Sequence, residues 1–357
     1  MNHTPIQLGT IPVGDGHPTV FVAEVGSFFN KDIELAFQYL RAAAAAGSPI
    51  FKTEIIHDAD ICLAGTGLVT EYHHAAGKRI EDYRALVERK VVPLADYRRL
   101  FDLCHELKVP FLATVFDFVG IDFLAETGAV AIKISRDNVN NLPLIRYAAR
   151  TGLPMIFDAG VIYFDEIARA VRCAQDAGCG GVVVNHHPGA NPARPEVHHM
   201  RVMQTYKEAL GVPVGLACHY RGDEILYLAV GMGANLLEKG VVDDPDRVES
   251  DLVSALPLSE IRTVVEKVEK CWRAIGTAPA RHNEPRDLSA RKGLIAKRAI
   301  AAGEVLTLDN VGFAWPCVGI SVEHWDVVAE QCAGVALEKN QPLEWADVKF
   351  ASARENR

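Results

Sequence analysis

Charged side chains interrupt or follow short apolar runs at several places in this chain of 357 residues. One such stretch, residues 130–144 (VAIKISRDNVNNLPL), begins with an apolar run that contains Lys133, and Arg136 follows that run. Its small and branched apolar residues are typical of a buried strand. Two cations at the tip of a buried strand are costly unless an anionic ligand or acidic partners neutralise them. Lys133 and Arg136 therefore indicate a site that binds a phosphate or a carboxylate.

Similar apolar runs along the chain also end in polar side chains. The residues at those ends are Glu24, Lys52, Glu54, Thr114, Asp158, His186, His187, His219, Glu238 and Lys239. Any one of them alone is as readily a structural polar group as a functional one. Their recurrence at every predicted strand end favours one polar pocket, with a cationic wall that faces acids and imidazoles. The wall consists of Lys52, Lys133 and Arg136, and the acids are Glu24, Asp158 and Glu238.

Three histidines near these ends raise the question of a metal. His186 and His187 follow the sixth run and His219 follows the seventh. Neighbouring strands can bring imidazoles to one divalent metal, to which Glu238 or Glu24 would add an oxygen ligand. The spacing is not a closed local motif, however. The alternative is that one of the paired histidines lines the pocket and the other packs behind it.

These polar residues lie on a regular alternation of predicted strands and helices. The strands are expected within residues 19–26, 48–56, 110–117, 129–135, 153–160, 180–187, 212–220 and 235–240. Such alternation implies parallel strands with right-handed crossovers, and eight units over roughly 260 residues predict an α/β fold of the TIM (β/α)8 barrel type. The strand ends would then meet at the active-site face. A doubly wound open sheet is the alternative, disfavoured because no G-x-G-x-x-G follows the first strand.

The pattern changes twice outside this alternation. Residues 57–93 show no clean period and are expected to form a long loop with a short helix. Residues 277–289 are rich in proline and charge and are expected to be a linker. We therefore predict a barrel over 1–276 and a small, mostly-β second domain over 290–357.

Composition excludes several classes of protein. The net charge of -9 argues against a nucleic-acid partner. No apolar run is long enough to span a membrane, and the N-terminus lacks the basic and apolar regions of a secretory signal. The eight cysteines include no C-x-x-C pair. Reduced thiols and a cytoplasmic location are the simplest interpretation.

Several motifs together resemble those of one known family, the sialic acid (N-acetylneuraminate) synthases. The motifs are AEVG at 23–26, FKTE at 51–54, LATVFD at 112–117, IKISRDNVNNLPL at 132–144, NHHPGANP at 185–192, GLACHY at 215–220 and LEKG at 237–240. Residues 294–307 (LIAKRAIAAGEVLT) resemble the antifreeze-like SAF domain that follows the barrel in that family. Order and spacing are similar across both predicted domains.

The resemblance implies a chemistry. Members condense phosphoenolpyruvate with an N-acetylmannosamine-type sugar, use a divalent metal that is usually Mn or Mg, and commonly form a domain-swapped homodimer. By this resemblance, Glu24 matches the acid near the sugar, and Lys52, Thr114 and Lys133 match the phosphoenolpyruvate-binding set. His219 matches one of two metal-binding histidines. The predicted catalytic residues are Glu24, Lys52, Lys133 and His219; the predicted substrate-binding residues are Thr114, Arg136, Asp158, His186 and Glu238; the predicted metal ligands are His219, His186 and His187.

The chain also departs from the family at ligand positions. Arg136, Asp158 and Ala217 stand where the family has serine. Gly240 replaces the second metal-binding histidine, which would weaken metal binding, and Trp315 replaces an arginine that contacts the sugar. The first loop reads SFFNK at 27–31, where the family has INHNG.

Three hypotheses follow from the retained and altered positions. The first is a synthase that joins phosphoenolpyruvate, or a related enolizable carboxylate, to an N-acyl hexosamine or another aldehyde sugar. The second is a lyase or aldolase that works without phosphoenolpyruvate, through a Schiff base on Lys133 or Lys52. The third is a non-catalytic paralogue that binds a sugar or regulates an active synthase.

Overall fold

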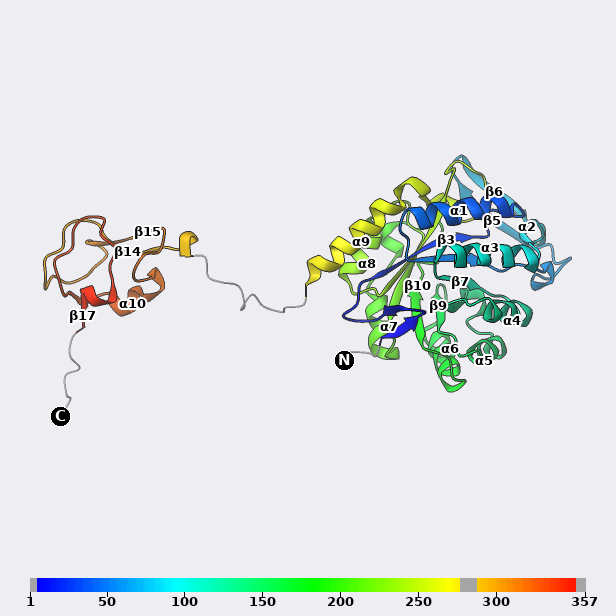
Figure 1. Cartoon of the computed structure of the whole chain (residues 1–357), viewed down its shortest axis with the longest axis horizontal. Helices are drawn as coiled ribbons and strands as arrows, with labels where there is room; N and C mark the ends of the chain where they lie inside the picture. The colour runs from blue at the N-terminus through cyan, green and yellow to red at the C-terminus, as the bar shows by residue number, and fades with distance from the viewer. Residues whose placement is uncertain (1–4, 277–287, 351–357) are drawn as a thin grey trace. The chain divides into compact units, whose positions relative to one another are not determined.

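The computed structural model describes residues 5–276 and 288–350, and the chain divides into two compact units, 1–277 and 278–357. Each unit is described by itself. Most of the predicted linker, residues 277–287, lies outside the described residues. In Figure 1 the first unit runs from blue to yellow and the second from orange to red.

The first unit is a closed barrel of eight parallel strands. They are β3 (Val20–Gly26), β4 (Ile50–Glu54), β7 (Phe111–Thr114), β8 (Ala131–Ile134), β9 (Met155–Ala159), β10 (Val182–His186), β11 (Val214–Cys218) and β12 (Leu236–Val242). Each strand pairs with the next in this order, and β12 pairs back with β3. Closure confirms the predicted TIM barrel and rules out an open sheet.

Helices surround the barrel (Figure 1). They are α1 (Ile33–Ala45), α3 (Leu94–Leu107), α4 (Phe118–Glu126), α5 (Leu142–Ala149), α6 (Phe164–Asp176), α7 (Val202–Leu210), α8 (Glu224–Gly231) and α9 (Ile261–Ile275). Several begin at a capping side chain: Asp32, Asp117 and Asn141 each accept a hydrogen bond from a backbone N–H in the first turn. Each cap fixes the residue at which its helix starts, and so fixes the length of the loop between that helix and the preceding strand.

Side chains alternate between the barrel interior and the helices, because successive residues of a strand point to opposite faces. One interior layer is apolar and lies toward the N-terminal ends of the strands. It consists of Val20, Val22, Ile50, Leu112, Ala131, Ile156, Val183 and Leu236. Two residues further along each strand, the next inward positions are mostly polar. The barrel thus has an apolar floor beneath a polar layer.

A hairpin covers the bottom of this floor. Strands β1 (Ile6–Leu8) and β2 (Ile11–Val13) pair in antiparallel fashion, and Leu8 and Val13 are buried in the same cluster as the apolar layer. Gly9 takes the positive φ of the tight turn between them.

The stretch 57–93 contains more structure than the predicted loop. It forms a hairpin of β5 (Val69–His74) and β6 (Gly77–Asp82), followed by α2 (Tyr83–Lys90). The expectation of a short helix is confirmed, whereas the hairpin was missed. Its strands are largely exposed, so their sequence lacks the alternation of a half-buried strand.

The second unit has its own small core. Its pairings are β14 (Gly293–Ala296) with β15 (Val311–Ala314) and β16 (Cys332–Ala333) with β17 (Val348–Lys349), both antiparallel, and α10 (Trp325–Val328) is its one-turn helix. Eleven buried apolar residues, among them Leu294, Ile320 and Leu343, form one cluster. Within the described parts of both units, no helix has the length and apolarity needed to cross a membrane.

Candidate active site

The polar layer of the barrel gathers most of the predicted site residues. Its members are Glu24, Lys52, Thr114, Lys133, Asp158, Asn185 and Glu238, which occupy inward positions on seven strands. Backbone register places Thr114 beside Lys133, Asp158 beside Asn185, and Glu24 beside Lys52. These residues lie at the C-terminal ends of the strands, which is where TIM barrels carry their active sites.

Two buried lysines share one carboxylate at the centre of this layer. The ammonium of Lys133 contacts Glu238 and lies 2.8 Å from Oδ2 of Asp158. The ammonium of Lys52 contacts Glu24 and lies 3.2 Å from Oε1 of Glu238. The side chains of Lys52, Lys133 and Glu238 are at most 3% exposed. Lys52 and Lys133 are therefore neutralised within the layer, as burial requires.

Burial and these contacts separate the pKa values of the three acids. Burial raises the pKa of Glu24 to about 8, against the attraction of Lys52, and raises that of Asp158 to about 6, against Lys133. Burial acts in the same direction on Glu238, but Lys133 and Lys52 outweigh it and hold the pKa of Glu238 at about 2. Glu238 is therefore the permanent anion, whereas Glu24 can exchange a proton near neutral pH.

Three polar atoms in the layer have no hydrogen-bond partner. They are Oγ1 of Thr114, Oδ1 of Asp158 and Oδ1 of Asn185, all buried. Buried polar atoms are nearly always paired, so unpaired ones at a barrel mouth fit a bound ligand. Asn185, whose Nδ2 lies 3.5 Å from Oε2 of Glu238, is not among the predicted site residues. The alternation of side chains along a strand predicts its position. Val183 points into the barrel, and Asn185, two residues further along the same strand, must therefore point inward as well.

Arg136 and Asp158 do not pair with each other. Asp158 pairs with Lys133, whereas Nη1 of Arg136 lies 3.5 Å from the carbonyl oxygen of Gly189. Arg136 is exposed, on a 3-10 turn directly after β8, and none of the described carboxylates forms an ion pair with it. It is thus a cation that remains available to a ligand at the mouth.

The three histidines separate into two groups. The rings of His187 and His219 lie 4.3 Å apart, centroid to centroid, and burial lowers the pKa of both. Nδ1 of His187 accepts a hydrogen bond from the backbone N–H of Gly189. His186 points the other way: its Nε2 contacts the carbonyl oxygen of His198 and its ring lies beside Tyr206 of α7. The structure therefore does not bring His186 to the other two histidines.

The donor set does not fit the metal that the resemblance implies. No group of three or more His, Cys, Asp or Glu side chains in residues 5–276 and 288–350 is arranged to hold an ion. At the position of the second histidine, a Cβ on Gly240 would lie 3.3 Å from the ring of Phe28. Phe28 is buried in an apolar cluster with Val242 and Leu252. Apolar packing therefore occupies the place of the family's second metal-binding histidine, and no step of the reaction is assigned to a metal.

Comparison with known families gives the decisive match. A model described as the NeuB family matches residues 39–279, and a model described as the SAF domain matches residues 291–349. The chain belongs to the NeuB family. The resemblance inferred from the motifs is thereby confirmed, and the small C-terminal unit of this NeuB-family chain is a SAF domain.

Relatives of this NeuB-family chain carry synthase names. It is 26% identical over 313 residues to the N,N'-diacetyllegionaminic acid synthase of Campylobacter jejuni, covering 86% of this chain and 93% of the relative. It is also 26% identical over 315 residues to the N-acetylneuraminate-9-phosphate synthase of Mus musculus, covering 85% and 86%. A crystal structure of an N-acetylneuraminic acid synthetase from Leptospira borgpetersenii has a TM-score of 0.70, 24% identity, and coverage of 80% of this chain and 93% of that one. That likeness supports the fold.

The position at which the family has a sugar-contacting arginine lies in the SAF domain. Trp315 is 68% exposed and Nζ of Lys292 lies 5.1 Å from the centroid of its ring. The indole thus presents an apolar face where the family has a cation.

Proposed function

We propose that this NeuB-family chain is a nonulosonic acid synthase-type enzyme, a transferase that forms a carbon–carbon bond. It would join phosphoenolpyruvate, or a related enolizable carboxylate, to an N-acyl hexosamine or another aldehyde sugar. The enol carbon attacks the aldehyde carbon, water adds to the carbon that bears the phosphate, and inorganic phosphate leaves. The observation that carries the proposal is the buried Lys52–Glu238–Lys133 cluster at the barrel mouth, beside unpaired polar atoms.

Each residue of the layer receives a role under this proposal. Lys52 and Lys133 would turn from Glu24 and Asp158 toward the carboxylate of the substrate, and Arg136 would bind its phosphate. Glu24, whose pKa is raised to about 8 by burial, would donate or accept a proton near neutral pH. Oγ1 of Thr114 and Oδ1 of Asn185 would bind polar groups of the substrates.

The Schiff-base alternative is weaker. A lysine that attacks a carbonyl must be neutral, which requires a lowered pKa. Burial alone would lower the pKa of Lys133, but Asp158 and Glu238 raise it above its ordinary value, and Lys52 behaves similarly. The third hypothesis, a non-catalytic paralogue, is motivated by Gly240 and Trp315 and is separated from the first by a turnover assay.

The assay uses the purified full chain with phosphoenolpyruvate and a panel of N-acyl hexosamines, with and without Mn2+. We expect phosphate release together with a 2-keto acid product, and loss of at least about 100-fold in rate in Lys133→Gln. Lys270→Gln, an exposed change on α9, is the matched control. Absence of both products with every sugar would exclude the synthase, and borohydride labelling of Lys133 or Lys52 would support the aldolase instead.

Two further expectations remain proposals. A domain-swapped homodimer is tested by light scattering of the full chain, which would give twice the 39.0 kDa chain mass. A cytoplasmic location is tested by cell fractionation.

A further inference from the structure

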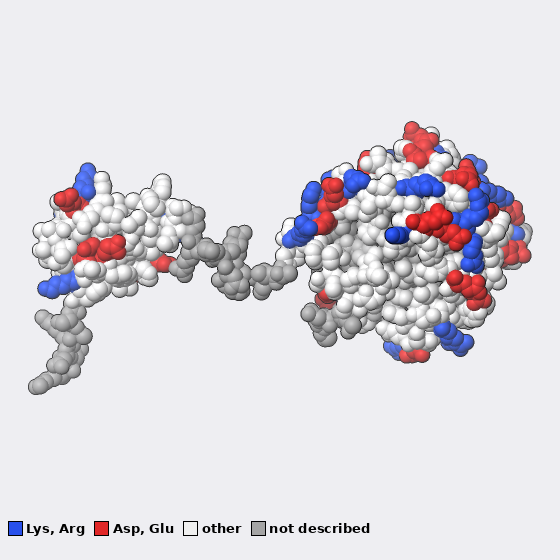
Figure 2. Space-filling view, viewed as in Figure 1, with Lys and Arg blue, Asp and Glu red and all other residues white. Residues whose placement is uncertain are grey.

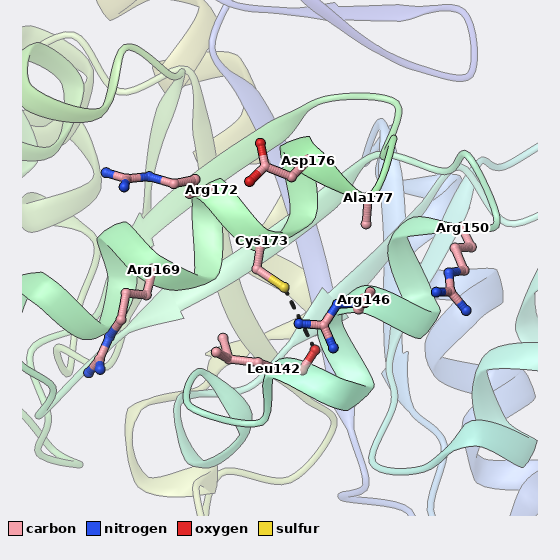
Figure 3. A pocket seen from close by; sticks show the side chains of 8 residues that line it. All are labelled: Leu142, Arg146, Arg150, Arg169, Arg172, Cys173, Asp176 and Ala177. Carbon is pink, nitrogen blue, oxygen red and sulfur yellow. Dashed lines mark hydrogen bonds between the residues drawn. The ribbon is translucent and has the colours of Figure 1, made fainter.

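A basic groove lies on the outside of the barrel, away from the polar layer. Helices α5 and α6 form its two walls, and its volume is about 550 Å³. Arg146 and Arg150 come from or directly follow α5, and Arg169 and Arg172 come from α6. Figure 3 shows Arg146 lying over Cys173 and Leu142, while the other arginines extend from the rim. We call this feature the arginine groove.

The helices place these arginines together by spacing. Residues four apart, such as Arg146 and Arg150, or three apart, such as Arg169 and Arg172, lie on one face of a helix. The opposite faces, including Ile145 of α5, pack into the barrel core. The guanidinium groups are therefore directed away from the core by the same periodicity that buries the apolar residues.

The charge in the groove is largely unneutralised. Arg169 pairs with Asp165 at 3.0 Å, and Asp176 also lines the groove. Among the described residues, no carboxylate lies within ion-pair distance of Arg146, Arg150 or Arg172. Like charges three or four residues apart on a helix repel each other, and an anion bound between them would relieve that repulsion.

Several other arginines of the barrel surface are neutralised. Arg84, Arg89, Arg99 and Arg247 each pair with at least one carboxylate. On the face shown in Figure 2, positive and negative side chains of the barrel lie next to one another. In a chain of net charge -9, acids are abundant, yet three arginines that line one groove have no ion pair among the described residues.

We propose that the arginine groove binds a small molecule that carries two or more phosphoryl groups on an apolar body, such as a nucleoside polyphosphate. Guanidinium groups bind phosphoryl oxygens in bidentate geometry. The floor made by Leu142, Cys173 and Ala177 offers an apolar surface for the remainder of the ligand. The site is independent of the proposed synthase activity, because none of its residues belongs to the polar layer.

The test is isothermal titration calorimetry on the full chain, with adenosine triphosphate and inorganic tripolyphosphate as probes at low and physiological salt. We compare Arg146→Gln/Arg172→Gln with Arg41→Gln/Arg201→Gln, which removes the same charge from exposed positions outside the groove. The groove variant should weaken binding of both probes about tenfold or more. The control should change it less than about twofold. Circular dichroism checks that both variants remain folded.

Other outcomes overturn the proposal. No binding of either probe excludes the site, and equal loss in the two variants shows that binding reflects only the general surface charge. Saturable binding of poly-glutamate without binding of either phosphate probe would assign the groove to an acidic protein segment instead.

Discussion

At the scale of single residues, Glu238 decides the electrostatics of the barrel mouth. It contacts both Lys52 and Lys133, so that one fully buried carboxylate holds two ammonium groups. Glu24 pairs with Lys52 and Asp158 pairs with Lys133. Burial raises the pKa of both acids. A substrate carboxylate could therefore replace Glu24 or Asp158 beside a lysine without dismantling the centre of the cluster.

Glu24→Gln should change how stability depends on pH. The pKa of Glu24 is about 8 in the folded chain, against an ordinary value of 4.5. Its contribution is thus fully present below pH 4.5 and is lost as the pH rises through 8. Each pKa unit corresponds to about 1.4 kcal/mol, so the loss amounts to a few kcal/mol. Urea unfolding between pH 5 and 8 should show a flatter free energy of unfolding for Glu24→Gln.

The matched control is Glu106→Gln on α3, which is exposed. This variant should follow the pH dependence of the unchanged chain. If Glu24→Gln follows it as well, the raised pKa of Glu24 is refuted.

Restoring the missing metal ligand should require two changes. Gly240→His alone would drive a side chain against the Phe28 ring, so we expect no gain in Mn2+ affinity. Phe28→Asn/Gly240→His removes that ring and should strengthen Mn2+ binding at least about tenfold, measured by calorimetry. Tight, stoichiometric Mn2+ binding by the unchanged chain would contradict the view that apolar packing has replaced the site.

Much of the site could be predicted from residue types alone, but orientation could not. Glu24, Lys52, Lys133 and Glu238 meet because they share strand parity and axial position. His186 was included for its type, yet it is one residue out of phase and points to the helices. Which lysine meets which acid depends on barrel stagger, which no local pattern encodes.

At the scale of elements, regular alternation made the barrel predictable. Buried parallel strands are nearly continuous apolar runs, and helices between them have a clear apolar face. The hairpins β1–β2 and β5–β6 have short or exposed strands, so neither signal applies to them. Each hairpin is defined by the antiparallel pairing of its own two strands rather than by an apolar pattern.

Gly215 of strand β11 has no room for a larger side chain. A Cβ at Gly215 would lie 2.2 Å from Oδ1 of Asn185 and 2.7 Å from the backbone oxygen of Leu236. Because the backbone cannot yield easily, Gly215→Ala should destabilise the chain by about 1–3 kcal/mol. Gly231→Ala, at the end of α8, has open space around it and should cause no loss. Thermal unfolding of the two variants checks the contrast, and equal midpoints would contradict it.

At the scale of the whole molecule, the chain joins a large unit to a small one, each with its own core. The barrel buries several dozen apolar side chains, whereas the SAF domain has a single compact cluster. Domains of this small size are marginally stable on their own. The size difference predicts unequal resistance to heat.

Calorimetry of the full chain should therefore show two transitions, with the SAF domain unfolding at the lower temperature. A chain shortened to residues 1–277 should lose the lower transition and keep the upper one within a few degrees. A single transition that disappears or shifts strongly on truncation would show that the units unfold together.

The packing of the β1–β2 hairpin has a consequence for the order in which the barrel folds. Leu8 and Val13 pack against side chains contributed by strands from β3 to β12, and those side chains face one another only once the barrel has closed. The ribosome releases the hairpin before any strand of the barrel, and long before β12 exists. We therefore expect the hairpin to dock late, after the barrel strands that it covers have come together.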